Sequence, residues 1–315
     1  MTGASNLKSV VLIFSLTLSN TTERVVDARR MYSERCVIVY ARATIEVNER
    51  PIAHELRGDG VPIVLVAGTG YPGATWPAEF VQRLLTRHSV LTFDHRGTGA
   101  TPASSERYST RLFAQDAISL MDALGLPAAH VLGHSMGGRV AQWMALDRPE
   151  RLRTLILAAS GPGQFRDDRP VTRGVPVHAA KEMIELGYER YMREHIRDTF
   201  FTPEFAAAHP ERVAWLHDTF WAHRPDLENY LRHVVARQEH QTADRLGEIR
   251  MPTLVMIGDR DTQIMGTGSH AEQSEFLIAH LPNATRRVIE GAAHGYFWQL
   301  PERTADILLD WTSAR

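Results

Sequence analysis

The sequence predicts an α/β protein with a mostly parallel sheet, helices on both faces of that sheet and an inserted helical segment. From about residue 44, short apolar and β-branched runs alternate with stretches of helical periodicity. This alternation stops after residue 160 and resumes near residue 253. The length of 315 residues suits one large α/β domain with an insertion, or two ordinary domains.

The first half of the chain predicts a hairpin followed by two strand–helix–strand units. Residues 43–47 and 52–56 alternate in polarity around Asn48, Glu49 and Arg50, which is typical of a hairpin. Continuous apolar runs, as expected for strands buried on both faces, then alternate with helices. These elements are strand 62–67, helix 77–87, strand 89–93, helix 109–124, strand 130–133, helix 137–146 and strand 154–158.

The second half contains the insertion and the end of the core. Residues 161–247 are helical in pattern and rich in Trp, His, Arg and Phe, so we interpret them as a helical cap. The core resumes with strand 253–257, helix 271–280, strand 286–289 and helix 301–312. The predicted division is therefore a core of residues 44–160 and 248–315, the cap, and an N-terminal extension of residues 1–43.

The N-terminal extension contains one apolar run. Residues 10–18 follow Lys8 in the manner of a weak secretory signal, but the run is too short to span a bilayer. It carries Ser15 and Thr17, and no small-x-small cleavage site follows closely. We expect an extension or an added strand and a cytoplasmic protein, with secretion as the alternative.

Composition excludes several classes of function. The net charge of -2 comes from 35 basic and 37 acidic residues mixed along the chain, so no basic stripe is present for nucleic acid. The only lysines are Lys8 and Lys181, and Val177 stands where a Tyr-x-x-x-Lys dehydrogenase site would need tyrosine. The single cysteine, Cys36, cannot form an intramolecular disulfide or a thiolate metal cluster.

A Gly-x-Ser-x-Gly motif lies between a predicted strand and a predicted helix, with Ser135 at its centre. Gly133 and Gly137 lack a Cβ, which permits the strained turn that lifts a serine hydroxyl above the sheet. The helix that follows points its N-terminus at the serine and favours negative charge there. The motif is common, so its position between strand and helix carries the argument.

A serine hydroxyl needs a base within hydrogen-bond reach, and the base needs an orienting carboxylate. His294 follows the strand 286–289 and Asp261 follows the strand 253–257, in the order Ser, Asp, His. Asp259 is the competing acid. We prefer Asp261, two residues further from the strand end, mainly because of the family comparison that follows.

The chain resembles the α/β-hydrolase superfamily from about residue 44 to its C-terminus. The matching landmarks are the glycine-rich turn after Val66, the turn Asp94–Gly99, the serine motif, Gly258-x-x-Asp261 and the loop of His294. The resemblance implies an α/β-hydrolase fold, with the cap as its variable part. It also implies that Asp94 and Arg96 belong to a scaffold corner and take no part in catalysis.

The resemblance further implies an oxyanion hole made of two backbone N–H groups, those of Met136 and Thr69. Many relatives begin the second turn with His-Gly, whereas this chain has Ala67 and Gly68. This departure leaves Gly70 as an alternative to Thr69.

A dinucleotide-binding oxidoreductase is the strongest rival. Gly68, Gly70 and Gly73 form a Gly-x-Gly-x-x-Gly pattern after a strand, and Asp94 ends the next strand about twenty residues later. Against this, Pro77 places the helix start later than the third glycine requires. The rival also leaves the serine motif and the His294 loop unexplained.

A metal hydrolase is a second rival because the cap is rich in histidine. Its histidines include His217, His223, His233 and His240. Their spacing fits no metal motif, and His54-Glu55 lacks the second histidine of a zinc helix. The aromatic residues Trp215, Phe220 and Trp221 predict cap packing or the wall of a substrate pocket.

These observations predict a serine hydrolase that cleaves an ester or related carbonyl substrate through an acyl-enzyme. The same triad could instead serve a C–C bond hydrolase, a lactonase or a cofactor-free perhydrolase, and a non-catalytic receptor on this scaffold remains an alternative. We expect a small-molecule substrate, no cofactor and no metal. We expect no nucleic acid or membrane partner, and a homodimer is left open.

Overall fold

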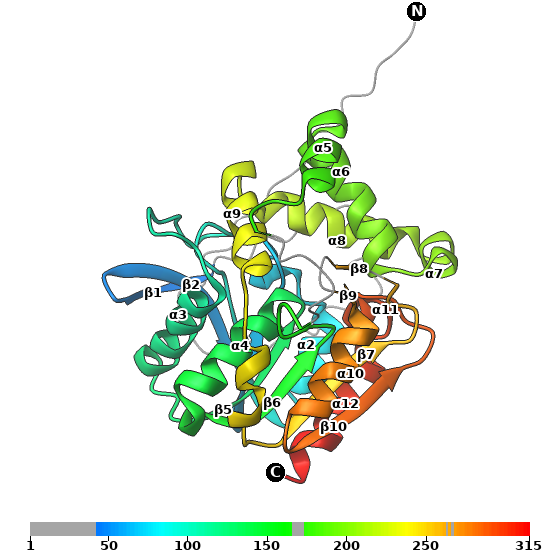
Figure 1. The fold of residues 1–315 in the computed structure, drawn as a ribbon. Coiled ribbons are helices and arrows are strands. Elements are labelled where there is room, and N and C mark those ends of the chain that lie inside the picture. Colours follow the sequence, from blue (N-terminus) through cyan, green and yellow to red (C-terminus); the bar gives the residue numbers. More distant parts are fainter. Residues whose placement is uncertain (1–41, 166–172, 263, 266–267) are drawn as a thin grey trace, which may run out of the picture.

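The computed structural model describes residues 42–165, 173–262, 264–265 and 268–315. The expectations for residues 1–41 lie outside these ranges. The described chain forms an eight-stranded sheet in the order β1-β2-β4-β3-β5-β6-β7-β10 (Figure 1). The strands are β1 (Ala43–Val47), β2 (Arg50–Arg57), β3 (Val61–Val66), β4 (His88–Phe93), β5 (Ala129–His134), β6 (Leu152–Ala158), β7 (Thr253–Gly258) and β10 (Ala284–Ile289).

The sheet is mostly parallel, as predicted. Only the pairs β1 with β2 and β2 with β4 are antiparallel, and every other neighbouring pair is parallel. The antiparallel β1–β2 ribbon turns over two residues, Asn48 and Glu49, which both have positive φ. Arg50 was expected in the connecting loop but is the first residue of β2 and pairs with Val47 of β1. The turn needs only two residues, because a turn with both φ angles positive matches the twist of the strands.

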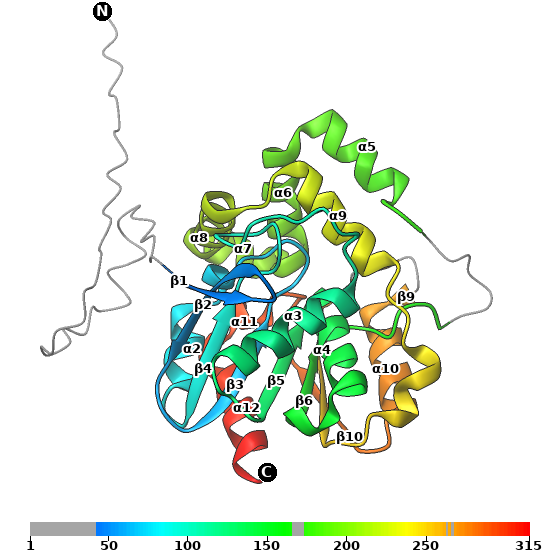
Figure 2. The ribbon, with the colours of Figure 1, turned by 90° about the vertical axis from the view of Figure 1, so that its left-hand side faces the viewer.

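Helices cover both faces of the sheet (Figure 2). One face carries α3 (Thr110–Ala123), α4 (Met136–Asp147) and α10 (His270–His280), and the other carries α2 (Ala78–Leu84) and α12 (Pro301–Ser313). Strand β3 shows how the sequence divides between the two cores. Val64 and Val66 face the α3–α4 side while Ile63 and Leu65 face the α2–α12 side, because side chains alternate along a strand.

The predicted boundaries lie within three residues of those in the structure, with the largest difference at the end of the predicted helix 77–87, which stops at Leu84. Ser109 accepts a hydrogen bond from the Leu112 N–H and caps α3, so the helix begins at the next residue. Ser269 and Glu272 form a capping box that starts α10 one residue before the prediction. A short antiparallel pair, β8 (Ile264–Met265) and β9 (Gly268–Ser269), precedes α10 and was missed.

Among the described residues, five α-helices lie between β6 and β7, where the sequence predicts a cap. These cap helices are α5 (Val177–Leu186), α6 (Tyr188–His195), α7 (Pro203–Ala208), α8 (Pro210–His223) and α9 (Leu227–Gln238). Figure 1 shows them on the side where β8, β9 and α11 (Tyr296–Gln299) follow the carboxyl ends of β7 and β10. Ligands of open parallel sheets bind at that edge. Whether the cap folds as a separate unit stays a prediction.

Short turns of other helix types complete the chain. They are η1 (Gly73–Thr75), η2 (Pro149–Arg151), the π-helical turn η3 (Ile196–Phe200) and η4 (Ala243–Glu248). Within the described ranges, no helix combines the length and the apolar character that crossing a membrane requires.

Candidate active site

Ser135 lies in the strained turn that its glycines predict, between β5 and α4. Its backbone has φ 55° and ψ -118°, a conformation that few side-chain-bearing residues adopt. A Cβ on Gly133 would lie 2.2 Å from the Gly137 carbonyl oxygen, and one on Gly137 would lie 2.0 Å from the Val66 carbonyl oxygen. The turn is therefore too tight for any side chain at either glycine.

Hydrogen bonds to the neighbouring strand hold the Ser135 backbone in this conformation. The Ser135 N–H donates to the Ala158 carbonyl over 2.8 Å, and the Ser160 hydroxyl donates to the Ser135 carbonyl over 2.7 Å. The Ser135 side chain remains partly exposed, whereas both flanking residues are buried. Ser135 is thus the one partly exposed residue of an otherwise buried turn.

Asp261 and His294 lie together beyond β7 and β10. The His294 Nδ1–H donates to Asp261 Oδ2 over 2.8 Å, and both side chains are buried. Asp259, the competing acid, instead accepts hydrogen bonds from the Gly291 and Ala292 N–H groups and so ties the loop of His294 to β7. With Nδ1 occupied by the carboxylate, His294 has only Nε2 left to act on a substrate.

The loop of His294 is fastened directly to the residue before Ser135. His134 Nε2–H donates to the His294 carbonyl over 3.0 Å, and the two imidazole rings have centroids 4.7 Å apart. These contacts bring together Ser135, from the elbow, and His294, from a loop 159 positions later in the chain. Burial lowers the pKa of His134 well below its usual value, and the nearby His294 lowers it further, so His134 is neutral at pH 7.

A second histidine, His270, binds Asp261 and was not identified from the sequence. Its Nδ1 lies 3.1 Å from Asp261 Oδ1 and 3.0 Å from Oδ2, and its ring stacks on that of His294 at 4.6 Å with an interplanar angle of 14°. His270 opens α10 directly after the capping box, and the sequence carries no motif that marks this histidine among 15.

The two imidazoles determine the charge on Asp261. Burial alone would raise the pKa of this carboxyl, but the partners His270 and His294 outweigh it and hold the pKa well below its usual range. Burial lowers the pKa of His270, which Asp261 opposes and which His294 and Arg139 reinforce. At pH 7 the group therefore contains one carboxylate, which accepts hydrogen bonds from His270 and His294, and His270 is neutral.

Asp261, His270 and His294 are also the only three described residues grouped closely enough to ligate a metal, with donor atoms within 4.8 Å of one another. Both Nδ1 atoms already donate to the carboxylate. A metal ion would displace both hydrogen bonds, so the donor set fits a hydrogen-bonded His-Asp-His group better.

The glycine-rich turn after β3 borders the serine. A Cβ on Gly68 would lie 3.4 Å from the Ser135 Cβ, which places this turn beside the nucleophile position. Met136 opens α4, where a helix offers no internal partner for its N–H. The Thr69 hydroxyl is buried without a hydrogen-bond partner. Both predicted oxyanion donors thus belong to segments next to Ser135.

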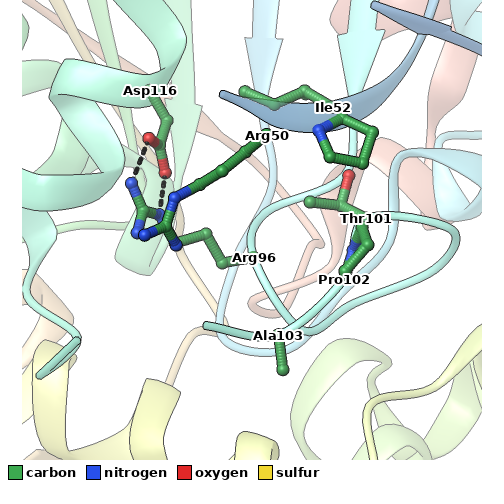
Figure 3. A pocket seen from close by; sticks show the side chains of 8 residues that line it. Arg50, Ile52, Arg96, Thr101, Pro102, Ala103 and Asp116 are labelled. Carbon is green, nitrogen blue, oxygen red and sulfur yellow. Dashed lines mark hydrogen bonds and ion pairs between the residues drawn. The ribbon is translucent and has the colours of Figure 1, made fainter. Parts of the chain in front are cut away.

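The turn Asp94–Gly99 serves the scaffold. Asp94 accepts hydrogen bonds from the Gly73 and Ala100 N–H groups, so its two oxygens hold adjacent loops together. Arg96 forms a bidentate pair with Asp116 at 2.5 and 2.6 Å (Figure 3). The pair lines a cavity of only about 50 Å³ beside Arg50. Because both oxygens of Asp94 already accept backbone N–H groups, Asp94 does not fit the ribose-binding role of the dinucleotide rival.

The cap histidines do not gather into a cluster. His233 Nε2 binds the Arg96 carbonyl, and His240 binds the hydroxyls of Thr110 and Thr242. These contacts join the cap to the core. In the part of the chain that the structure describes, neither histidine belongs to a group that could bind a metal.

Aromatic side chains from the cap pack against His294 and against Tyr71 of the glycine-rich turn. The π-helical turn η3 directs Phe200 edge-on to His294 at 5.4 Å, while the Phe200 carbonyl accepts the Gly295 N–H. Tyr71, from the glycine-rich turn, contacts both Phe200 and Phe220 at 5.0 Å. Of the three predicted cap aromatics, Phe220 therefore reaches this wall. Trp221 stacks instead on His217 and contacts the tilted ring of Tyr188. Trp215 packs against the core as a partly buried side chain.

The comparisons with known proteins identify the family. A model of the alpha/beta hydrolase fold family matches residues 61–301. The chain belongs to this family. Among curated relatives, it is 31% identical over 259 residues to "Putative carbamate hydrolase RutD" of Pseudomonas savastanoi pv. phaseolicola, which covers 82% of this chain and 95% of the relative. It is 29% identical to the protein of the same name from Azorhizobium caulinodans, over 81% of this chain and 92% of the relative.

Solved structures share this hydrolase's fold. An enol-lactonase from Burkholderia xenovorans LB400 superposes with a TM-score of 0.74 at 21% identity, over 86% of this chain and 100% of the other. An esterase from Exiguobacterium antarcticum gives 0.73 at 23% identity, over 87% and 100%. At such identities the likeness concerns the fold alone. The predicted α/β-hydrolase fold and the predicted family are confirmed.

Proposed function

We propose that this α/β hydrolase is a serine hydrolase that cleaves an ester or related carbonyl substrate through an acyl-enzyme. Ser135 is the nucleophile, His294 the base, and Asp261 the acid that orients it. The observation that carries the proposal is the 2.8 Å hydrogen bond from His294 Nδ1–H to Asp261, in a loop that His134 fastens beside Ser135.

The first half of the reaction forms the acyl-enzyme. His294 Nε2 accepts the Ser135 proton as Oγ attacks the carbonyl carbon, and the charge passes to the carbonyl oxygen. The N–H groups of Met136 and Thr69 receive that oxyanion. When the tetrahedral intermediate collapses, the bond to the leaving group breaks and His294 returns the proton to it. Asp261, kept ionised by two histidine donors, stabilises the imidazolium.

The second half releases the acyl group. Water loses a proton to His294 Nε2 and attacks the ester carbon, and the proton then returns to Ser135 Oγ. The acid leaves and the hydroxyl is restored. No electron transfer occurs in either half.

Ser135→Ala tests the proposal. We expect ester hydrolysis to fall by at least about 10⁴-fold, because the nucleophile is removed, and labelling by a fluorophosphonate probe to disappear. Asp259→Asn is the matched control for Asp261→Asn, since only the latter changes the partner of His294. An alanine variant that stays active, or equal losses for the two aspartate variants, would refute the assigned roles.

The substrate panel should follow the relatives and the mechanism. It includes esters of graded acyl length, a lactone, a vinylogous diketone and, because curated relatives carry the name of carbamate hydrolases, a carbamate. Turnover separates an enzyme from a receptor on the same scaffold, and the preferred bond separates an esterase from a lactonase or a C–C hydrolase.

A further inference from the structure

One arginine under the cap, Arg237 on α9, has no charge partner. Its Nε is buried without a hydrogen-bond acceptor, and no carboxylate pairs with its guanidinium among the described residues. Burial lowers the pKa of Arg237, and the only groups that oppose this are the phenols of Tyr230 and Tyr191. Arg237 as a whole is only partly buried, so a ligand can reach its guanidinium. A guanidinium with a buried Nε and no anion is costly, so this position favours an anionic ligand.

Tyr230 and His195 link Arg237 to the surroundings of Ser135. Tyr230 and Arg237 are seven residues apart on α9, which is two turns, so they share a helix face about 10 Å apart along the axis. The Tyr230 ring borders the glycine-rich turn, where a Cβ on Gly70 would lie 2.7 Å from Tyr230 Cδ2. His195, on the opposite cap helix, feels the charges of both Arg237 and His294. We call Tyr191, His195, Tyr230 and Arg237 the wall. It runs from the glycine-rich turn to the guanidinium of Arg237.

The other side chains around Arg237 are Tyr191, Tyr230 and His195, which are uncharged at pH 7. Burial raises the pKa values of Tyr230 and Tyr191, so both hydroxyls stay protonated at pH 7. Burial, Arg237 and His294 lower the pKa of His195 to about 4, so it is neutral. The nearby acids are paired or exposed: Glu194, next to His195, pairs with Arg190 at 2.8 Å, and Asp198 pairs with Arg197 at 2.6 Å. Glu182, which acts on Tyr191, is exposed.

The neighbouring arginine is already occupied. Arg139 donates from Nη1 to the Arg237 carbonyl over 2.5 Å and from Nη2 to Gln273 Oε1 over 3.2 Å. It holds the C-terminal turn of α9 and so positions Arg237. One uncommitted guanidinium carries one positive charge, which matches a carboxylate better than a phosphate dianion.

We propose that Arg237, with the hydroxyls of Tyr191 and Tyr230, binds a carboxylate of the substrate while Ser135 attacks a carbonyl elsewhere in the same molecule. The inference rests on the proposed serine mechanism and narrows its substrate class to acyl compounds that carry a second, ionised carboxyl group. Planar carboxylates accept two N–H bonds from a guanidinium, which fixes the distance from the anion to the attacked carbon.

Kinetics with a charged and a neutral ester test the selectivity. For wild type, kcat/KM for the mono-p-nitrophenyl ester of glutaric acid should exceed that for p-nitrophenyl pentanoate by about 10- to 100-fold, as expected for a charged hydrogen bond. Arg237→Gln should remove most of this preference, and Arg237→Lys should retain part of it. Arg190→Gln is the matched control, because Arg190 is an exposed cap arginine paired with Glu194.

The same series locates the anion. Mono-esters of succinic and adipic acid change the distance between the carboxylate and the scissile carbonyl, and one length should be preferred. Equal losses for charged and neutral esters in Arg237→Gln, or no preference of wild type for any charged ester, would overturn the proposal.

Binding to an inactive variant separates this proposal from the serine mechanism. In calorimetry, Ser135→Ala should bind glutarate and not glutaramide. The double variant Ser135→Ala with Arg237→Gln should have an affinity for glutarate that is lower by about tenfold or more. Glutarate bound equally by both variants would overturn the subsite. If wild type binds glutarate but is not labelled by fluorophosphonate, the serine mechanism is refuted and the carboxylate subsite is not.

Discussion

The turn around Ser135 and the wall around Arg237 are built in different ways. The turn is fixed by backbone contacts between residues close in sequence, with glycines where a Cβ would meet a carbonyl oxygen at 2.0 to 2.2 Å. The wall is assembled from side chains on α6 and α9, and its charge has no protein partner among the described residues. Under the two proposals, the chemistry would depend on local backbone geometry, whereas substrate selection would depend on packing between distant elements.

The largest expected effect breaks the turn itself. Gly137→Ala places a methyl group 2.0 Å from the Val66 carbonyl oxygen and 2.7 Å from that of Ala67, so Ser135 and the glycine-rich turn after β3 must move apart. Because a misplacement of about 1 Å can cost a factor of about 100, we expect kcat/KM to fall at least about 100-fold. Stopped assays on a labelled ester measure the loss of kcat/KM, and the melting temperature measures the loss of stability.

Gly247→Ala is the control for that change. Gly247 lies in η4, and a Cβ there meets nothing within 4 Å. Its activity should match wild type. A Gly137→Ala variant with wild-type kcat/KM would show that the turn tolerates a side chain and would weaken the role of backbone geometry.

A smaller effect is expected between the two regions, at His270. His270→Phe keeps a ring against His294 but removes the donor to Asp261. We expect kcat/KM to fall about tenfold, since one hydrogen bond to a buried carboxylate is lost. His270→Asn, which restores an N–H donor at a similar position, should recover part of the activity.

The pH profile distinguishes a positioning role of His270 from a purely structural one. The titratable groups around His270 are Asp261, His294, His134 and Arg139. Without its second donor, Asp261 attracts the imidazolium of His294 more strongly, so the acidic limb of kcat/KM should move to higher pH by up to about one pH unit. An unchanged limb with reduced activity would assign His270 to packing alone.

The sequence predicted the turn well because its constraints are local. Gly133, Ser135 and Gly137 stand within five positions, and the order of Asp261 and His294 after two strands follows from the parallel sheet. The preference for Asp261 over Asp259 came mainly from the family resemblance. In the structure Asp261 binds His294, and Asp259 binds the loop backbone.

The wall could not be predicted in the same way. Tyr191 and Arg237 lie on separate cap helices, and their meeting depends on how α6 and α9 pack, which periodicity does not specify. His270 is one of 15 histidines, and only the fold brings it to Asp261. The stretch 161–247 was recognised as helical, but which of its charged groups face the serine is a tertiary property.

The smallest expected effect concerns the stability of the wall in acid. Burial, Arg237 and His294 lower the pKa of His195 to about 4, against about 6.5 for histidine in an unfolded chain. Above pH 6.5 the residue is neutral in both states and contributes nothing. As the pH falls below 6.5, only the unfolded chain takes up a proton, so the free energy of unfolding falls until about pH 4.

His195→Phe, which keeps the ring stacked on Tyr191, should therefore reduce the loss of stability between pH 7.5 and pH 5 by about 1 to 2 kcal/mol in urea unfolding. His178→Phe, at an exposed position of α5, should keep the wild-type pH dependence. Parallel curves for wild type and His195→Phe would mean that the cap opens before His195 titrates, and that contacts other than those of His195 hold these side chains together.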